Sequence, residues 1–145
     1  MNDKDKELLF IDLCGRIPYK VRMFEIEPIN DIQSNLTLLS ITNKESVICI
    51  TPSGGVIGSS IDAFKPYLFP LSSMTEEQRE EFLNIQTEER QILLNALIEY
   101  KSGKYDKIPI IAPYKQIEWL NKNHFDYRGL IEKGLAIDAT NLNVY

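Results

Sequence analysis

The chain has 145 residues, of which 43% are hydrophobic and 26% charged, and its net charge is −5. A chain of this size can bury a core large enough to fold without disulfides or metal ions, so we expect one domain spanning residues 1–145. Its acidic balance, with scattered Lys and Arg, argues against nucleic-acid binding, which needs a concentrated basic face.

No apolar run approaches the roughly 20 residues that a membrane helix requires, and residues 1–7 lack the order of a signal peptide. We therefore expect a cytoplasmic protein without a membrane partner. Cys14 and Cys49 both lie in apolar runs, which predicts two buried free thiols rather than a secreted disulfide.

The first 60 residues predict one helix followed by strands. The pattern of residues 6–17 is ambiguous, but its length and its apolar residues at 10, 13, 14 and 17 favour a mostly buried helix over a strand. Pro18 ends this helix. Residues 19–27, 36–42 and 46–51 have strand character, and Val56-Ile57 predicts a fourth short strand. Short connections between these strands indicate an antiparallel meander with one face covered.

The second half has helical patterns. Residues 64–70 contain two prolines, which predict an extended crossing rather than regular structure. Thr75 and Gln78 have the spacing of a capping box at the start of a helix over about 76–85. A helix over about 88–101 follows, and the pattern leaves open whether the two are continuous. This second helix carries a broad apolar face, formed by Ile92, Leu93, Leu94, Leu97 and Ile98.

Two further helices are predicted near the C-terminus. Pro113 can open the first, and residues 128–133 can form a short one closed by Gly134. Leu135 then falls where a helix-ending motif packs a hydrophobic residue onto Leu130.

These elements predict an α+β fold: a small curved antiparallel sheet of three to five strands, an N-terminal helix and a helical C-terminal half. The helix and meander span about 6–60, and the helical region spans about 75–136. The alternative for the first 60 residues is a barrel of the Sm or SH3 type.

Residues 119–136 hold the only tryptophan and the only histidine. His124 with Asp126 can serve as a general base with its orienting partner, and Tyr127 is a further catalytic candidate. No nucleophile lies beside them in the sequence. We favour a structural interpretation in which His124 caps the preceding helix and Asp126 begins the next.

Other candidate motifs have simpler explanations. Residues 54–60 resemble a phosphate loop but lack its lysine, and the Gly-Gly pair suits a hairpin turn. Six glutamates between 76 and 89 lack the histidines of a two-metal site and predict a solvated helix face. The sequence therefore predicts no metal site, no cofactor and no assigned catalytic residue.

Three blocks of the sequence carry a resemblance: residues 9–19, residues 65–77 (Lys-Pro-Tyr-Leu-Phe-Pro-Leu-Ser-Ser-Met-Thr-Glu-Glu), and residues 119–136, which include His-Phe-Asp-Tyr-Arg-Gly-Leu-Ile-Glu-Lys-Gly-Leu-Ala. With these blocks the chain resembles a family of small uncharacterised proteins encoded in prophages and mobile elements of gut anaerobes. The resemblance implies a phage-associated cytoplasmic protein and no particular activity.

Three functions remain open. The leading prediction is a non-enzymatic protein-binding or adaptor domain that uses exposed aromatic and arginine side chains, because these are typical of interface hot spots. The predicted binding residues are Tyr67, Phe125, Tyr127 and Arg128. The second is a small-ligand or nucleotide binder, and the third is a small hydrolase or nuclease using His124. A homo-oligomer is an open option.

Overall fold

The computed structural model describes residues 1–26, 36–43, 45–104 and 114–145. They form two compact units. Residues 1–73 with 121–145 make the sheet unit, and residues 74–120 make the helical unit. The expectation of a single domain stays a prediction.

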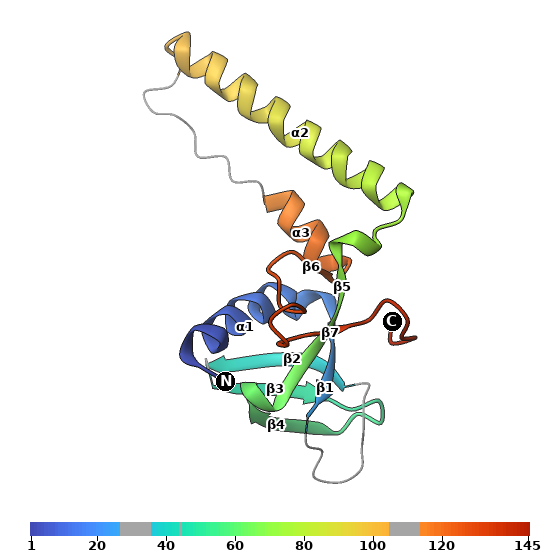
Figure 1. The fold of residues 1–145 in the computed structure, drawn as a ribbon. Coiled ribbons are helices and arrows are strands. Elements are labelled where there is room, and N and C mark those ends of the chain that lie inside the picture. Colours follow the sequence, from blue (N-terminus) through green and yellow to red (C-terminus); the bar gives the residue numbers. More distant parts are fainter. Residues whose placement is uncertain (27–35, 44, 105–113) are drawn as a thin grey trace. The chain divides into compact units, whose positions relative to one another are not determined.

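The sheet unit has the predicted mixed α+β character (Figure 1). Its described residues form one α-helix, seven strands and three short 3-10 helices: α1 (Asp3–Arg16), η1 (Ile17–Tyr19), β1 (Arg22–Glu25), β2 (Leu36–Asn43), β3 (Ser46–Ile50), β4 (Val56–Ser60), η2 (Ile61–Ala63), β5 (Phe64–Pro70), η3 (Leu71–Ser73), β6 (Phe125–Asp126) and β7 (Ile137–Asp138).

The strands form one open sheet in the order β4-β3-β2-β1-β5-β6, with β7 also pairing with β5. The antiparallel meander from β1 to β4 is confirmed. The sheet is larger than the three to five strands predicted, and the barrel alternative is wrong. The reason is that β1 uses its second edge to pair with β5, so the meander does not close on itself.

Residues 64–70 form a strand, so the prediction of a crossing without regular structure is wrong here. β5 pairs antiparallel with β1 and parallel with the two-residue strands β6 and β7. Pro66 lies opposite Met23, and Pro70 is the last residue of the strand. A proline has a fixed φ that is compatible with extended structure, and a strand tolerates it where its missing N–H is not needed.

Helix α1 packs on one face of the sheet (Figure 1). Leu9 and Leu13 from the helix join the buried side chains of the strands in one core, which includes Val21, Met23, Leu36, Leu38, Val47, Cys49, Phe64 and Leu68. Cys49 is buried as predicted, and burial together with the nearby Glu25 raises the pKa of its thiol to about 12. Cys14 is exposed, because the buried side of α1 runs through residues 9, 12, 13 and 16.

In the helical unit, α2 (Glu76–Lys101) is one continuous helix of 26 residues. The predicted capping box is present: Thr75 N donates to Gln78 Oε1 at 2.9 Å, and Gln78 N donates to Thr75 Oγ1 at 3.3 Å. The last helix, α3, spans Tyr114–Lys122. Pro113, predicted to open it, lies outside the described residues.

Helices α2 and α3 contact each other through side chains between Lys115 and Trp119 of α3. The rings of Phe82 and Trp119 lie 5.4 Å apart. The buried carboxylate of Glu89 accepts hydrogen bonds from Lys115 N at 2.8 Å and from Gln116 Nε2 at 2.6 Å. An acceptor from α2 therefore satisfies an N–H group in the first turn of α3, which has no partner within that helix.

The short helix predicted over residues 128–133 is wrong, because this segment consists of turns. Gly129 has a φ of +72°, which a right-handed helix does not allow. The predicted ending at Gly134 is nevertheless confirmed: Leu135 N donates to Leu130 O at 2.9 Å and Gly134 N donates to Ile131 O at 3.0 Å. These two bonds are those of a Schellman motif, which therefore forms without a regular helix before it.

We predict that Glu89→Ala destabilises the packing of α3 on α2 by about 1–3 kcal/mol, because it leaves two donors without their buried acceptor. Glu89→Gln keeps one acceptor oxygen and is expected to lose less. Urea denaturation followed by tryptophan fluorescence measures both, because Trp119 lies at this contact. Equal stability of Glu89→Ala and the wild type would contradict the role of this carboxylate.

Candidate functional site

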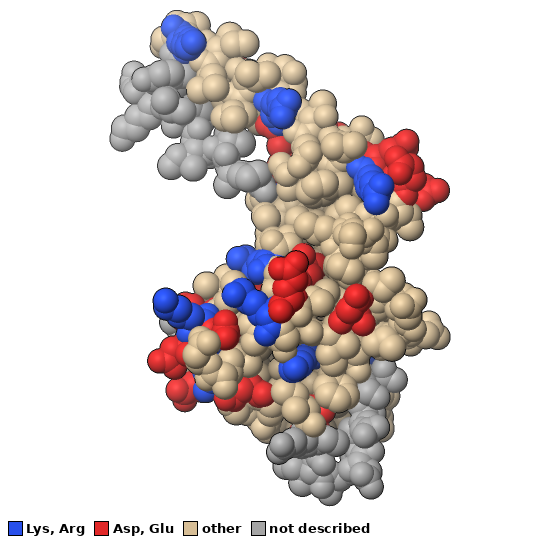
Figure 2. Space-filling view, in the orientation of Figure 1, with Lys and Arg blue, Asp and Glu red and all other residues tan. Residues whose placement is uncertain are grey.

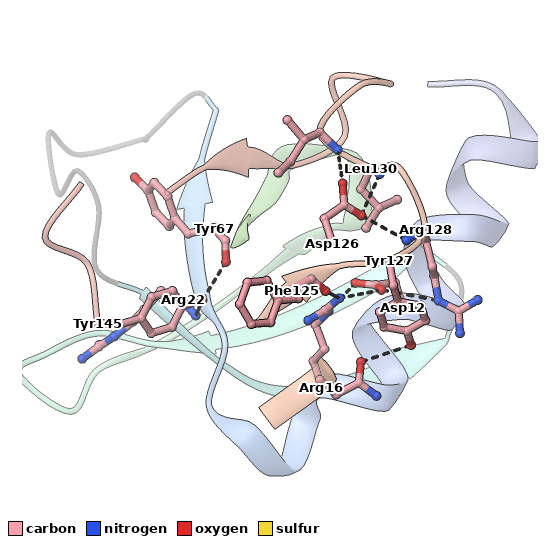
Figure 3. Close-up of polar contacts among 12 residues, drawn as sticks. Asp12, Arg16, Arg22, Tyr67, Phe125, Asp126, Tyr127, Arg128, Leu130 and Tyr145 are labelled. Carbon is pink, nitrogen blue, oxygen red and sulfur yellow. Dashed lines mark hydrogen bonds and ion pairs between the residues drawn. The ribbon is translucent and has the colours of Figure 1, made fainter. Parts of the chain in front are cut away.

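The dominant polar feature of the sheet unit is a buried ion pair within α1 (Figure 3). Asp12 and Arg16 are four residues apart, so they lie on the same side of the helix, and both side chains are 0% exposed. Arg16 Nε donates to Asp12 Oδ2 at 2.6 Å, and Arg16 Nη2 donates to Asp12 Oδ1 at 3.0 Å. Such a two-bond arrangement is the strongest geometry for an arginine–carboxylate pair.

The same arginine connects α1 with the C-terminal part of the chain. Arg16 Nη2 also donates to the carbonyl oxygen of Phe125 in β6, at 2.8 Å. Nη1 of Arg16 has no hydrogen-bond partner among the described residues. The bond to Phe125 spans 109 positions of sequence, so it fixes β6 against the N-terminal helix.

Arg128 and Tyr127 extend this cluster toward the surface (Figure 3). Arg128 Nε lies 3.4 Å from Asp12 Oδ1, so two cations share one carboxylate. The guanidinium carbons of Arg16 and Arg128 lie 5.6 Å and 4.9 Å from the centre of the Tyr127 ring. Contacts of this kind between a cation and a ring stabilise by about 0.5–2 kcal/mol, the more so when water is excluded.

Asn121 places Tyr127 and requires a glycine in α1. The Tyr127 hydroxyl donates to Asn121 Oδ1 at 3.1 Å. A Cβ atom added to Gly15 would lie only 2.9 Å from Asn121 Nδ2. Glycine inside a helix is unfavourable by itself, so its presence here is explained by this close approach.

The Asp126 carboxylate accepts hydrogen bonds from the backbone of the following turn. Its Oδ1 accepts from Leu130 N at 2.9 Å and from Arg128 N at 3.2 Å, and its Oδ2 accepts from Ile131 N at 2.8 Å. These three bonds fix the backbone of residues 128–131 around the carboxylate. The predicted capping interaction of Asp126 is present, although it closes a turn instead of starting a helix.

His124 follows α3 with a φ of +59°, in the left-handed region that histidine tolerates better than most residues. Its ring stacks on Tyr145 with centroids 4.0 Å apart and planes inclined by 13°. The Nδ1 atom is buried and has no hydrogen-bond partner among the described residues. The pKa of His124 is lowered to about 4, mainly by burial and to a smaller extent by repulsion from Arg16. The ring is therefore neutral at pH 7.

Tyr145 holds the end of the described chain on β5. Its hydroxyl donates to Tyr67 O at 2.6 Å and accepts from Arg22 N at 3.2 Å. Although 45% of the residue surface is exposed, the hydroxyl itself lies inside, and burial raises the pKa of Tyr145. Figure 3 shows the Tyr145 ring beside Arg22.

The structure places the predicted binding residues in different environments. Tyr67 and Phe125 are buried, so their rings do not form an exposed contact surface. Tyr127 and Arg128 are partly exposed, and their role in binding stays a prediction.

The three catalytic candidates engage separate partners. His124 stacks on Tyr145, Asp126 binds backbone N–H groups, and Tyr127 binds Asn121. A general base needs a partner that orients it, and Asp126 does not supply one here. Within the described ranges, no three His, Cys, Asp or Glu side chains gather to hold a metal ion. The arrangement is suited to joining α1 with the C-terminal segment.

No protein-family model, curated protein or solved structure matches the chain. The resemblance to prophage and mobile-element proteins therefore stays a prediction. None of the helices in the described part of the chain is both long and apolar enough to span a membrane.

The sequence-based prediction missed the centre of the cluster, which consists of Asp12, Gly15, Arg16 and Asn121. One signal was available: two opposite charges four residues apart, Asp12 and Arg16, inside the mostly apolar stretch of residues 8–17. Such a pair can be buried as a unit, whereas a single charge in the same run would be costly. The partners from residues 121–128 carry no comparable signal, because they depend on the tertiary fold.

We predict that the effect of Gly15→Ala on stability depends on the residue at position 121 and has opposite signs in two backgrounds. In the wild type it lowers stability, because the new methyl group collides with Asn121. In an Asn121→Ala background it raises stability by up to about 1 kcal/mol, since alanine is the better helix former. Chemical denaturation of the four proteins measures the coupling; equal stabilisation by Gly15→Ala in both backgrounds would contradict the contact.

We also predict that His124 makes the sheet unit less stable in acid. Its pKa is about 4 in the fold and about 6.5 in an unfolded chain. Between these values only the unfolded chain binds the proton, so stability falls as pH drops from 6.5 to 4. The loss is below about 3 kcal/mol, and less because the ring is partly exposed to solvent.

His124→Asn isolates this contribution, because asparagine also tolerates a positive φ but does not titrate. Urea denaturation at several pH values should show a shallower loss of stability for the variant between pH 6.5 and 4. Identical pH dependences of the wild type and the variant would exclude His124 as the source.

Proposed function

We propose that the chain is a non-enzymatic protein-binding domain and that it contacts its partner through the second half of α2. One observation carries this proposal. Ile92, Leu93, Leu94 and Ile98 are 47%, 40%, 47% and 65% exposed. They lie within two turns of one another, and a cluster of exposed apolar side chains of this kind is typical of an interaction site.

The described contacts of α3 with α2 precede the exposed apolar residues of α2 in the sequence. Among the described residues, α2 contacts α3 through the ring of Phe82 and through the polar side chains of Gln86, Glu88 and Glu89. The apolar residues begin three positions later and point to several sides of the helix. A helix that is apolar on several sides is normally buried, so a partner is the natural cover.

The charge of α2 favours a particular kind of partner. The helix has seven glutamates against three basic residues, and six of the glutamates precede Arg90. In Figure 2 much of the α2 surface between its charged groups is tan. The acidic half thus precedes the apolar one. A partner helix with an apolar stripe for residues 92–98, and basic residues beyond that stripe toward the acidic first half of α2, would complement both properties.

The two alternatives have less support. A small-ligand binder would use a pocket lined by Tyr67 or Arg128, and the Tyr67 ring is buried. A hollow of about 370 Å³ in the sheet unit is lined by other residues: Met1, Ile26, Asp62 and Ala63. A hydrolase using His124 would need an oriented base, and the contacts of His124 are with Tyr145. An origin in a prophage or mobile element remains part of the proposal.

A photo-crosslinking amino acid placed at position 94 or 98 tests the proposal in cells that produce the protein. We expect the same partner to be captured from both positions. We also expect Leu94→Glu with Ile98→Glu to abolish its binding, because the two charges must be desolvated at an apolar contact.

Leu39 and Leu142 provide the matched control, since both are exposed leucines of the sheet unit. Crosslinkers at these positions should not capture the partner, and Leu39→Glu with Leu142→Glu should retain binding. Capture from the control positions alone, or no capture from positions 94 and 98, would overturn the assignment of this surface.

A further inference from the structure

Strand β4 forms one edge of the sheet. Among the described residues it pairs only with β3, in a regular antiparallel register from Ser46 opposite Ser60 to Ile50 opposite Val56. Its outer backbone groups therefore face away from the sheet. An edge of this kind is a template for pairing with another strand.

This edge lacks the usual protection against pairing. Natural sheets block an exposed edge with charged side chains, proline, a bulge or a very short strand. The sequence of β4 is Val-Ile-Gly-Ser-Ser, with no charge and no proline. Its five residues are an ordinary strand length, and its register with β3 has no irregularity, unlike that of β2 with β3.

The glycine at the middle of β4 is a second indication that this edge can pair with another strand. Gly58 is exposed and has no positive φ that would explain a glycine. A Cβ atom added there would make only ordinary contacts, 3.9 Å from Ile48 and from the backbone of Val47. The monomer fold therefore does not require glycine, and a residue without a side chain meets no steric or charge conflict with the residue opposite it on a pairing strand.

We propose that β4 pairs antiparallel with β4 of a second copy of the chain, with Gly58 at the two-fold axis. This register places Val56 opposite Ser60 of the partner, and Ile57 opposite Ser59 of the partner. Each pair joins a larger side chain with a small one, so the strand is complementary to itself.

The alternation of side chains agrees with this register. Val56, Gly58 and Ser60 are exposed, and Val56 has 63% of its surface accessible. Ile57 points to the other side and packs against the hydrophobic core. Pairing about Gly58 keeps both sets on their own faces, so the two sheets join without moving a core residue to solvent.

The absence of charge on β4 favours a second copy over a charged peptide as the partner. Identical charged strands would repel each other across a two-fold axis, and this strand has no such charges. Because five residues from each copy make a small contact, we expect a dissociation constant in the micromolar range or weaker.

A pair of charge variants at position 58 tests the proposal. Gly58→Lys and Gly58→Glu each place like charges opposite one another at the axis and should weaken dimerisation by about fivefold. An equimolar mixture of the two variants places the introduced lysine opposite the introduced glutamate and should restore association as a heterodimer. Sedimentation equilibrium from micromolar to near-millimolar protein measures all three, and circular dichroism verifies that each variant is folded.

Leu39→Lys and the pair Leu94→Glu with Ile98→Glu serve as controls, and both should dimerise like the wild type. A wild type that stays monomeric throughout the concentration range would overturn the proposal. So would variants that dimerise normally at position 58, a mixture that does not recover, or loss of the dimer on changing Leu94 and Ile98, which would place the contact on α2.

Discussion

A fully buried arginine in the first helix organises the sheet unit. Taking Arg16 and Asp12 out of water costs several kcal/mol per ion, which close pairing and further hydrogen bonds must offset. The side chain therefore requires Asp12 on its own helix and the carbonyl oxygen of Phe125 far along the chain. Removing one partner would leave a charge buried without compensation, so these groups depend on one another.

The C-terminal segment depends on such polar contacts because it contains little regular structure. β6 and β7 have two residues each, and turns lie between them. Asp126 gathers three backbone N–H groups, and the Schellman bonds close the turn at Gly134. Leu130 and Leu135 add apolar contacts with the core. Local capping and a few buried leucines thus replace the helix that the sequence predicts.

The sequence predicted correctly those features of the fold that depend on residues close together in the chain. The β1 to β4 meander, the capping box at Thr75 and the ending at Gly134 follow from alternation, side-chain capping and glycine geometry. Parallel pairing of β6 and β7 with β5 escaped prediction, because pairs of two residues have no periodicity. The two prolines of residues 64–70 led to the wrong prediction that β5 has no regular structure. In α1, Cys14 was predicted to be buried because it is apolar, whereas the charged Asp12 and Arg16 are buried and Cys14 is exposed. The catalytic interpretation of His124 came from its rarity, whereas its partner in the fold, Tyr145, lies 21 positions away.

The insertion of residues 74–120 between β5 and β6 has a consequence for synthesis on the ribosome. Residues 1–73 emerge first, with α1 and five strands but without the carbonyl group that Arg16 requires. The helical unit is then made in full while the sheet unit is still incomplete. Only when residues 121–145 emerge can β6 and β7 pair with β5. Until then this edge of β5 is exposed, and binding by a chaperone or by an early partner would shorten the time of exposure.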